Sequence, residues 1–323
     1  MDAIILENIH HVFRTTTGVL RRHTKEVTAL QEISLAVAAG ELFGLLGPNG
    51  AGKSTTVKIL TTLLIPSSGR ATVLGLDVER EATALRRHIG FVLGGERGLY
   101  YRLSGRDNLR YFAELYHVEP RLIPSRIEEV LELVGLRDRA DERIMGYSRG
   151  MKQRLHIARM LLHNPKVLFM DEPTQGLDPV ASRELRQTIK VLRAEGKTIL
   201  LTTHYMFEAD ELCDRIAIID QGKIIARGTP QELKALVSDL SIVELDVFGI
   251  DSEHVSLLKA LDFVDSIVVE ERDSRQTLRI QTPLGATAVP ALVAKLNGVT
   301  VGRVSVREAT LEDAYVRLVG RVE

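Results

Sequence analysis

The fold is decided by one stretch of the chain, Gly47-Pro48-Asn49-Gly50-Ala51-Gly52-Lys53-Ser54-Thr55. Its spacing of glycines, lysine and hydroxyl is that of a phosphate-binding loop. The apolar run 42–46 before it predicts a buried parallel strand, and 56–64 predicts a helix that ends before Pro66. The glycines allow successive N–H groups to face one anion, and the helix N-terminus adds partial positive charge. The stretch therefore predicts a nucleotide-phosphate site.

Two residues of this loop have predicted chemical roles. We expect Lys53 to reach the β- and γ-phosphates of a nucleotide, and Ser54 to hold Mg²⁺ through its hydroxyl. Glycine-rich turns between a strand and a helix also occur for packing alone. The complete motif in this setting favours nucleotide binding.

Two further strand ends carry chemistry. The apolar run 167–170 ends in Asp171 and Glu172. Proteins with a parallel sheet bind ligands at the carboxyl ends of its strands. We expect Asp171 to bind Mg²⁺ through water and Glu172 to orient or deprotonate a water. His204 ends another predicted buried strand, 198–203, so it can reach the same crevice.

Composition sets the class of protein. The chain has 323 residues, of which 45% are hydrophobic and 26% charged, which predicts a soluble globular protein with one large and one smaller domain. A net charge of −1 gives no reason to expect a nucleic-acid partner. Cys213 is the only cysteine, so an internal disulfide is excluded. Without a signal peptide or an apolar run near the roughly 18 residues of a membrane span, the chain is expected to be cytoplasmic.

The order of patterns predicts the domains. Helical patterns crowd the part from about 96 to 165, which predicts a helical subdomain inserted into an α/β core. From 241 onward the order β-α-β-β-α-β predicts a small ferredoxin-like α+β domain. The expected domains are therefore 1–235 and 240–323; the second has no catalytic constellation and could regulate, dock or dimerise. Within the basic segment 14–25, the cluster of Arg21, Arg22, His23 and Lys25 is interpreted as a solvated loop tip, with contact to lipid headgroups or an acidic partner as the alternative.

A family resemblance enters with Ser148-Arg149-Gly150-Met151-Lys152-Gln153-Arg154, which begins a helix before the strand 167–170. It resembles the signature motif, usually LSGGQ, of the ATP-binding cassette (ABC) family. In that family the signature of one subunit closes over the ATP held by another. Ser148 and the helix N-terminus would supply donors to the γ-phosphate. The resemblance covers roughly residues 4–232 and implies a P-loop NTPase cassette that uses ATP and Mg²⁺.

Other positions match the family's motifs. Asp178 matches the D-loop, His204 the switch histidine, and Phe13 the aromatic residue that stacks on adenine. The resemblance thus implies that Glu172 and His204 are catalytic. It implies a nucleotide-binding set of Phe13, Gly47, Pro48, Asn49, Gly50, Ala51, Gly52, Lys53, Ser54, Thr55, Ser148, Gly150 and Asp178.

Three segments of the chain resemble one particular group within the family. The segments 94–100, 147–153 and 311–315 look like the ATPase subunits of bacterial ABC-2 type exporters, similar to daunorubicin-resistance ATPases. In that group a separate membrane permease carries the substrate path, so the cargo is set by another chain. The resemblance implies a peripheral protein at the cytoplasmic face of the membrane. Its implied partners are a second copy or a homologous ATPase subunit, and integral membrane permease subunits.

Two positions depart from the family pattern. The Q-loop glutamine would fall at Gly94, which has no side chain to offer Mg²⁺, and Arg149 replaces a signature glycine. We hypothesise that Glu96 takes over part of the glutamine's role at the metal, directly or through water; the alternative is a solvated loop residue. Arg149 must either point away from the phosphate or reach toward it.

Other function classes are less favoured. Cassette ATPases that act on ribosomes usually carry two cassettes in one chain, and those of DNA repair carry long coiled coils. This chain has one cassette and no such insert. A GTP switch or a small-molecule kinase would not need the signature segment, and the sequence has no N-K-x-D guanine motif.

Overall fold

The computed structural model describes residues 1–17, 23–93, 98–237, 241–272 and 275–319. The chain forms two compact units, Met1–Thr229 and Pro230–Glu323. Helix α8 (Pro230–Ala235), which the expected boundary at 235 assigned to the first domain, contacts α11 (Leu311–Val319) of the second unit. Within the described residues, no helix has the length and apolar character needed to span a membrane.

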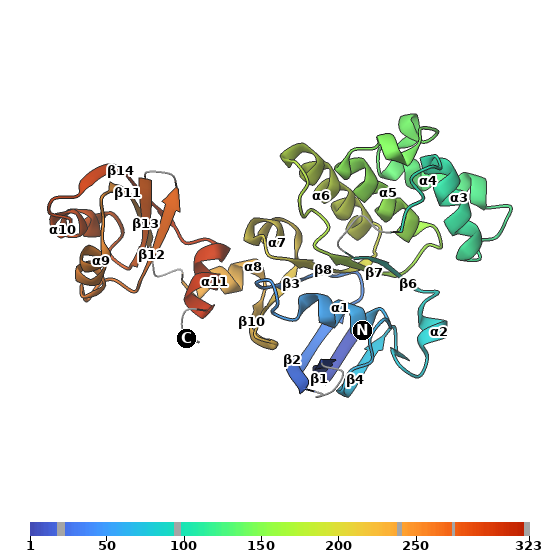
Figure 1. The fold of residues 1–323 in the computed structure, drawn as a ribbon, viewed down its shortest axis with the longest axis horizontal. Helices are drawn as coiled ribbons and strands as arrows, with labels where there is room; N and C mark the ends of the chain where they lie inside the picture. The colour runs from blue at the N-terminus through green and yellow to red at the C-terminus, as the bar shows by residue number, and fades with distance from the viewer. Residues whose placement is uncertain (18–22, 94–97, 238–240, 273–274, 320–323) are drawn as a thin grey trace. The chain divides into compact units, whose positions relative to one another are not determined.

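A six-stranded sheet in the order β10-β9-β3-β8-β7-β6 forms the centre of the first unit (Figure 1). Its strands are β3 (Leu42–Leu46), β6 (Ile89–Val92), β7 (Val167–Asp171), β8 (Thr198–Thr203), β9 (Arg215–Asp220) and β10 (Lys223–Gly228). All neighbours are parallel except the β9–β10 hairpin. Every residue of β3, β7 and β8 is buried, as expected of parallel strands covered on both faces.

A second, antiparallel sheet in the order β2-β1-β4-β5 belongs to the same unit. Its strands are β1 (Asp2–Thr17), β2 (His23–Ala38), β4 (Ser68–Val73) and β5 (Leu76–Asp77). Helix α1 (Lys53–Leu60) lies between the two sheets, and its Val57 and Leu60 are buried in a core that both sheets share. The helix begins and ends earlier than the expected 56–64, because the phosphate loop leads directly into its first turn.

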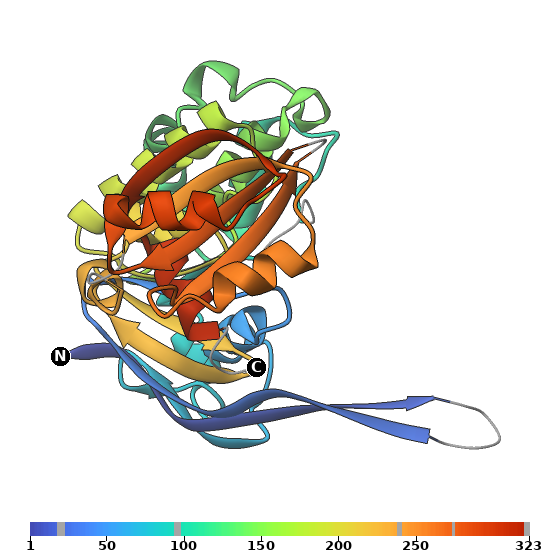
Figure 2. The same cartoon turned by 90° about the vertical axis from the view of Figure 1, so that its left-hand side faces the viewer.

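Strands β1 and β2 form a long hairpin that extends past the body of their sheet (Figure 2). Their pairing continues to Thr17 and His23, so His23 and Lys25, which were expected at a loop tip, lie on strand β2 instead. The physical reason is that an established antiparallel ladder can continue through polar residues. Residues 18–22 lie outside the described part of the chain.

Helices cover the other face of the parallel sheet (Figure 1). They are α3 (Gly105–Leu115), α4 (Ile123–Leu133), α5 (Arg149–Leu161), α6 (Pro179–Ala194) and α7 (Met206–Leu212), with 3-10 turns at Arg137–Arg139 and Ile144–Gly146. The short α2 (Ala82–Leu85), before β6, contacts β5 of the antiparallel sheet instead. Side-chain caps begin three of the helices: Ser104 caps α3, Ser148 caps α5 and Asp178 caps α6. The helical subdomain expected from the sequence corresponds to α3, α4 and α5.

The second unit has the expected ferredoxin-like order. Its elements after α8 are β11 (Ser241–Phe248), α9 (Ser252–Lys259), β12 (Ser266–Arg272), β13 (Arg275–Thr282), the 3-10 turn Gly285–Ala288, α10 (Val289–Ala294), β14 (Thr300–Glu308) and α11. The strands pair antiparallel in the order β12-β13-β11-β14. Leu258 of α9 and Leu292 of α10 are buried in a core on one face of this sheet. Asp313 of α11 pairs with Arg307 of β14, at 2.7 Å.

Candidate functional site

The site is assembled by strand order. Strand β3 lies directly beside β8, and β8 beside β7, all parallel. Their carboxyl ends therefore open onto one edge of the sheet. The phosphate loop follows β3, Asp171 and Glu172 end β7, and His204 follows β8. Residues from three distant parts of the sequence meet at this edge.

Glycines give the phosphate loop its shape. A Cβ on Gly47 would lie 2.2 Å from the carbonyl oxygen of Ile219, so no larger residue fits there. Gly52, the residue before α1, has a φ of +110°, which other residues rarely adopt. Ala51 in this loop is buried, whereas Asn49, Gly50 and Ser54 are exposed. The loop is thus open to a ligand on one side and packed against β9 on the other.

Lys53 is buried at this edge, with 4% of its surface exposed. Its Nζ donates to the carbonyl oxygens of Gly47 (2.6 Å) and Pro48 (3.1 Å). It also lies 3.2 Å from Oε1 of Glu172. The ammonium is therefore held across the mouth of the loop by three oxygen atoms.

Glu172 links the lysine to the histidine. Its second carboxylate oxygen, Oε2, lies 3.2 Å from Nδ1 of His204. The backbone of Glu172 has a φ of +47°, an unusual value for a residue with a side chain. Its N–H donates to the carbonyl and to the hydroxyl oxygen of Thr202, both at 3.1 Å. A strained backbone held by neighbouring contacts is common at functional sites.

Thr202 is a site residue that the sequence did not reveal. Its hydroxyl donates to Oδ1 of Asp171 at 2.5 Å, and the threonine is completely buried. One hydroxyl therefore orients both carboxylate residues at the end of β7. In the sequence Thr202 is one polar residue inside a strand pattern. The pair Thr202-Thr203 at the end of that pattern was the only sequence feature that could have indicated a site residue.

The signature residues lie on other elements. Ser148 accepts from the N–H of Met151 at 3.2 Å as the cap of α5, and Asp178 accepts from the N–H of Ala181 at 2.9 Å as the cap of α6. A Cβ on Gly150 would lie 2.7 Å from the Cβ of Ala181, so the first turns of α5 and α6 pack closely. Helix α5 contacts α3, α4, α6 and β6. The fold brings Ser148, Gly150 and Asp178 together as one group at the first turns of α5 and α6.

Phe13 and the Q-loop position complete the sequence expectations. Phe13 lies on β1, opposite Val27 of β2, with 40% of its surface exposed and its ring 4.6 Å from that of His11 in an edge contact. Gly94 and Glu96 lie outside the described residues, so the role of Glu96 stays a prediction.

Mg²⁺ fits the oxygen atoms of this edge. Among the described residues no cluster of three or more His, Cys, Asp or Glu side chains could hold a metal. Mg²⁺ in nucleotide sites needs no such cluster, because it usually takes one or two protein oxygens and completes its shell with phosphate and water. The buried carboxylate of Asp171, oriented by Thr202, is a donor of this kind.

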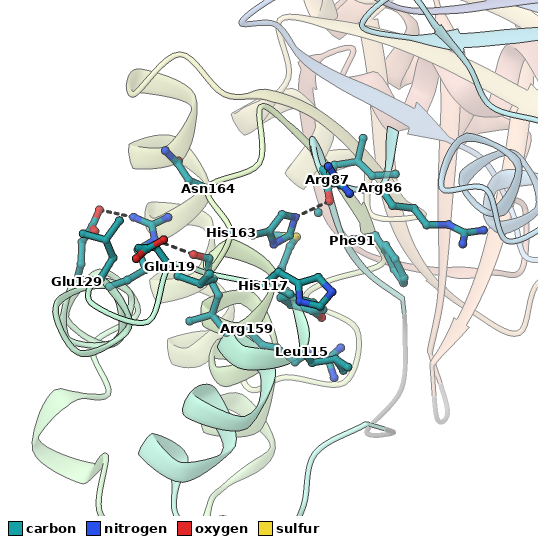
Figure 3. A pocket seen from close by; sticks show the side chains of 18 of the residues that line it. Arg86, Arg87, Phe91, Leu115, His117, Glu119, Glu129, Arg159, His163 and Asn164 are labelled. Carbon is teal, nitrogen blue, oxygen red and sulfur yellow. Dashed lines mark hydrogen bonds and ion pairs between the residues drawn. The ribbon is translucent and has the colours of Figure 1, made fainter. Parts of the chain in front are cut away.

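A large cleft lies away from this edge, between the helical subdomain and the edge strand β6. Its volume is about 1350 Å³. Figure 3 shows Arg86, Arg87 and Phe91 on the strand side and Leu115, His117 and Arg159 on the helical side. Arg159 donates from Nη1 to the carbonyl of Gly98 at 2.7 Å, and burial lowers the pKa of its guanidinium. Burial also lowers the pKa of His163, whose Nε2 lies 2.9 Å from the carbonyl of Ile89.

Comparison with known proteins decides the family. The family model described as ABC transporter matches residues 30–175. The linearmycin resistance ATP-binding protein LnrL of Bacillus subtilis is 38% identical over 91% of this chain and 94% of that protein. The chain belongs to the ABC transporter family. The daunorubicin resistance ATP-binding protein DrrA3 of Streptomyces coeruleorubidus is 39% identical over 95% of each chain.

Solved structures agree with this assignment. The cassette MJ0796, described as dimeric in a post-hydrolysis state with ADP and Pi, superposes with a TM-score of 0.62 at 26% identity. The match covers 70% of this chain and 98% of that one. The P-loop NTPase cassette expected from the sequence is confirmed. This ABC protein is an ATP-binding and ATP-hydrolysing subunit of the ABC-2 exporter type.

Proposed function

We propose that this ABC subunit binds MgATP in a sandwich between two copies, or between itself and a homologous subunit, at the cytoplasmic face of a membrane. Hydrolysis then drives a separate permease. The observation that carries the proposal is the meeting of Lys53, Glu172 and His204 at the carboxyl ends of adjacent strands.

Within one copy, the phosphate loop holds ATP. The backbone N–H groups of residues 49–55 surround the phosphates, and Lys53 moves from its carbonyl partners to the β- and γ-phosphate oxygens. Ser54 and Asp171 would hold Mg²⁺, the aspartate through water. The bound metal would neutralise charge that develops on the phosphates during transfer.

Glu172 acts as the base on the attacking water, and His204 keeps the carboxylate in place. Nζ of Lys53 lies 3.2 Å from Oε1 of the same carboxylate. When Lys53 moves to the phosphates, one carboxylate oxygen of Glu172 becomes free to accept from water, while His204 still holds the other. Binding of ATP therefore converts a neutralised pair into an available base.

The second copy completes the site. Ser148, Gly150 and Asp178 form a group at the starts of α5 and α6, and we assign this group to the ATP of the partner. The N-terminus of α5 has 13 residues of helix behind it and offers free N–H groups to an anion. Phe13 presents an exposed ring for stacking on the adenine.

The cleft beside β6 suits a cytoplasmic segment of the permease. Leu115 and Leu122 line it with 55% and 57% of their surfaces exposed, an arrangement that leaves apolar area for a partner. The charged side chains that line it can pair with polar groups at the ends of a permease helix. They are Arg86, Arg87, Arg126, Arg159, Glu119 and Glu129.

Two measurements test this function. The purified chain should hydrolyse MgATP, and co-expression with a permease of this family should yield a membrane-bound complex. Leu122→Asp should remove the chain from that complex without lowering its own ATPase activity. Leu257→Asp, which changes an exposed leucine of α9 outside the cleft, should leave the complex intact. A chain that hydrolyses ATP but never binds a membrane partner would contradict the transport assignment.

A further inference from the structure

Arg149 is the one signature residue whose place the family pattern does not explain. It is the first residue of α5, directly after the cap Ser148. A cation at a helix N-terminus is electrostatically unfavourable. Within the described part of the chain, no carboxylate lies within ion-pair distance of its guanidinium. Something other than an ion pair must therefore determine its position.

The guanidinium lies flat over Gly176. A Cβ built on Gly176 would lie 2.3 Å from Nη1, 2.4 Å from Cζ and 2.6 Å from Nη2 of Arg149. Three nearly equal distances mean that the guanidinium plane faces the glycine. Gly176 also has a φ of +70°, so a side chain is disfavoured there for two reasons. The guanidinium of Arg149 thus occupies the space beside residue 176 that is open only because Gly176 has no side chain.

Gly176 belongs to a compact turn that begins at the proposed base. The N–H of Gln175 donates to the carbonyl of Glu172 at 3.1 Å, and the N–H of Leu177 donates to the carbonyl of Thr174 at 3.1 Å. The turn ends at Asp178, the cap of α6. A displacement of Gly176 therefore bears directly on the backbone that positions Glu172.

We infer that Arg149 is a positioning residue that ties the signature turn to the segment 172–178, and thereby links the two ATP sites of a dimer. The inference rests on the proposed function, in which Ser148 serves the partner's ATP while Glu172 serves the chain's own. The Arg149–Gly176 contact joins these two parts within one chain. Closure of the signature over one ATP then fixes the base at the other.

The planar guanidinium, rather than its charge, carries this role. Lysine keeps the charge but has no plane to lie against the glycine. Arg149→Lys should therefore behave like Arg149→Gly, which restores the usual family residue. Both variants should lower kcat about tenfold and reduce the Hill coefficient for ATP from about 2 toward 1. Affinity for a fluorescent ATP analogue should stay within about twofold, because the phosphate loop is untouched.

The experiment compares ATP titrations of hydrolysis for the wild type, both Arg149 variants and Arg183→Lys. Arg183 is exposed on α6 and serves as the matched control. Thermal unfolding of each variant separates a folding defect, which would lower the melting temperature, from loss of coupling, which would not. Wild-type kcat and Hill coefficient in Arg149→Lys would overturn the inference. Absence of cooperative hydrolysis in the wild type would instead contradict the sandwich dimer itself.

Discussion

Nζ of Lys53 lies 3.2 Å from Oε1 of Glu172, so the residue proposed to bind the phosphates and the residue proposed as the base form a direct ion pair. Both side chains are largely buried, at 4% and 13% exposed. A buried pair of this kind leaves a costly unpaired charge when either member is removed. In the proposed mechanism, a change at either member of this pair therefore affects the other.

Lys53→Ala should abolish ATP hydrolysis and ATP-driven transport, because no other motif residue supplies a cation to the β- and γ-phosphates. Loss of a charged hydrogen bond of about 2 kcal/mol predicts an affinity for ATP roughly thirtyfold weaker. Calorimetric titration measures this loss. Lys58→Ala, on the exposed side of the same helix, is the control. Unchanged ATP binding and turnover in Lys53→Ala would contradict the assignment of the phosphate loop.

Glu172→Gln keeps the shape of the side chain and removes the proposed base. Hydrolysis should fall by about 10² to 10⁴, and ATP should stay trapped between two copies. Light scattering after size-exclusion chromatography, with and without MgATP, should show a nucleotide-dependent dimer. Glu195→Gln at the exposed end of α6 should change neither property. Wild-type hydrolysis in Glu172→Gln would exclude Glu172 as the base.

Thr202→Val removes the hydroxyl that orients Asp171 and receives the N–H of Glu172. The free energy of unfolding should fall by about 1–3 kcal/mol, and ATPase activity should require more Mg²⁺. Thr188→Val, which loses a hydroxyl bond to the carbonyl of Glu184 on α6, is a control for a buried threonine outside the site. An unchanged Mg²⁺ titration in Thr202→Val would show that the hydroxyl has no part in metal binding.

Phe13 offers a ring but no hydrogen bond to distinguish bases. GTP should therefore be hydrolysed at a rate comparable to ATP, and Phe13→Ala should weaken both nucleotides by about 1–3 kcal/mol. Competition binding measures both affinities. Val27→Ala, opposite Phe13 on β2, controls for changes in the hairpin. Strong preference for ATP would mean that another residue recognises the adenine amine.

His156 should make the cassette sensitive to acid. Burial, helped by nearby Arg159, lowers its pKa to about 4. Below the unfolded pKa of about 6.5, the unfolded chain binds a proton that the folded chain excludes. Stability should therefore fall between pH 6.5 and 4, by at most about 3 kcal/mol.

Urea unfolding at pH 7 and pH 5 tests this sign. The loss of stability between these pH values should be about 2 kcal/mol smaller in His156→Gln than in the wild type. His88→Gln, at an exposed position, should keep the wild-type dependence. Equal losses in all three proteins would exclude His156 as a source of acid sensitivity.

The sequence by itself determined the parts whose chemistry is local. A phosphate loop needs its glycines, lysine and hydroxyl within nine consecutive positions, 47–55, and a strand can deliver Asp171 and Glu172 at its end without help from elsewhere. The order β-α-β-β-α-β of the second unit was also predictable, because each element has its own apolar period. Family resemblance added Phe13, Ser148 and Asp178.

The tertiary structure alone decided which of these parts touch. Strand order is a long-range property, and only the adjacency of β3, β8 and β7 brings Thr202 to Asp171 and Lys53 to Glu172. The side chain of Arg149 could not be placed from the sequence, because Gly176 reaches it through the packing of α5 against α6. The local sequence pattern determines the chemistry that a residue can perform. The packing of distant segments determines which other residues it contacts.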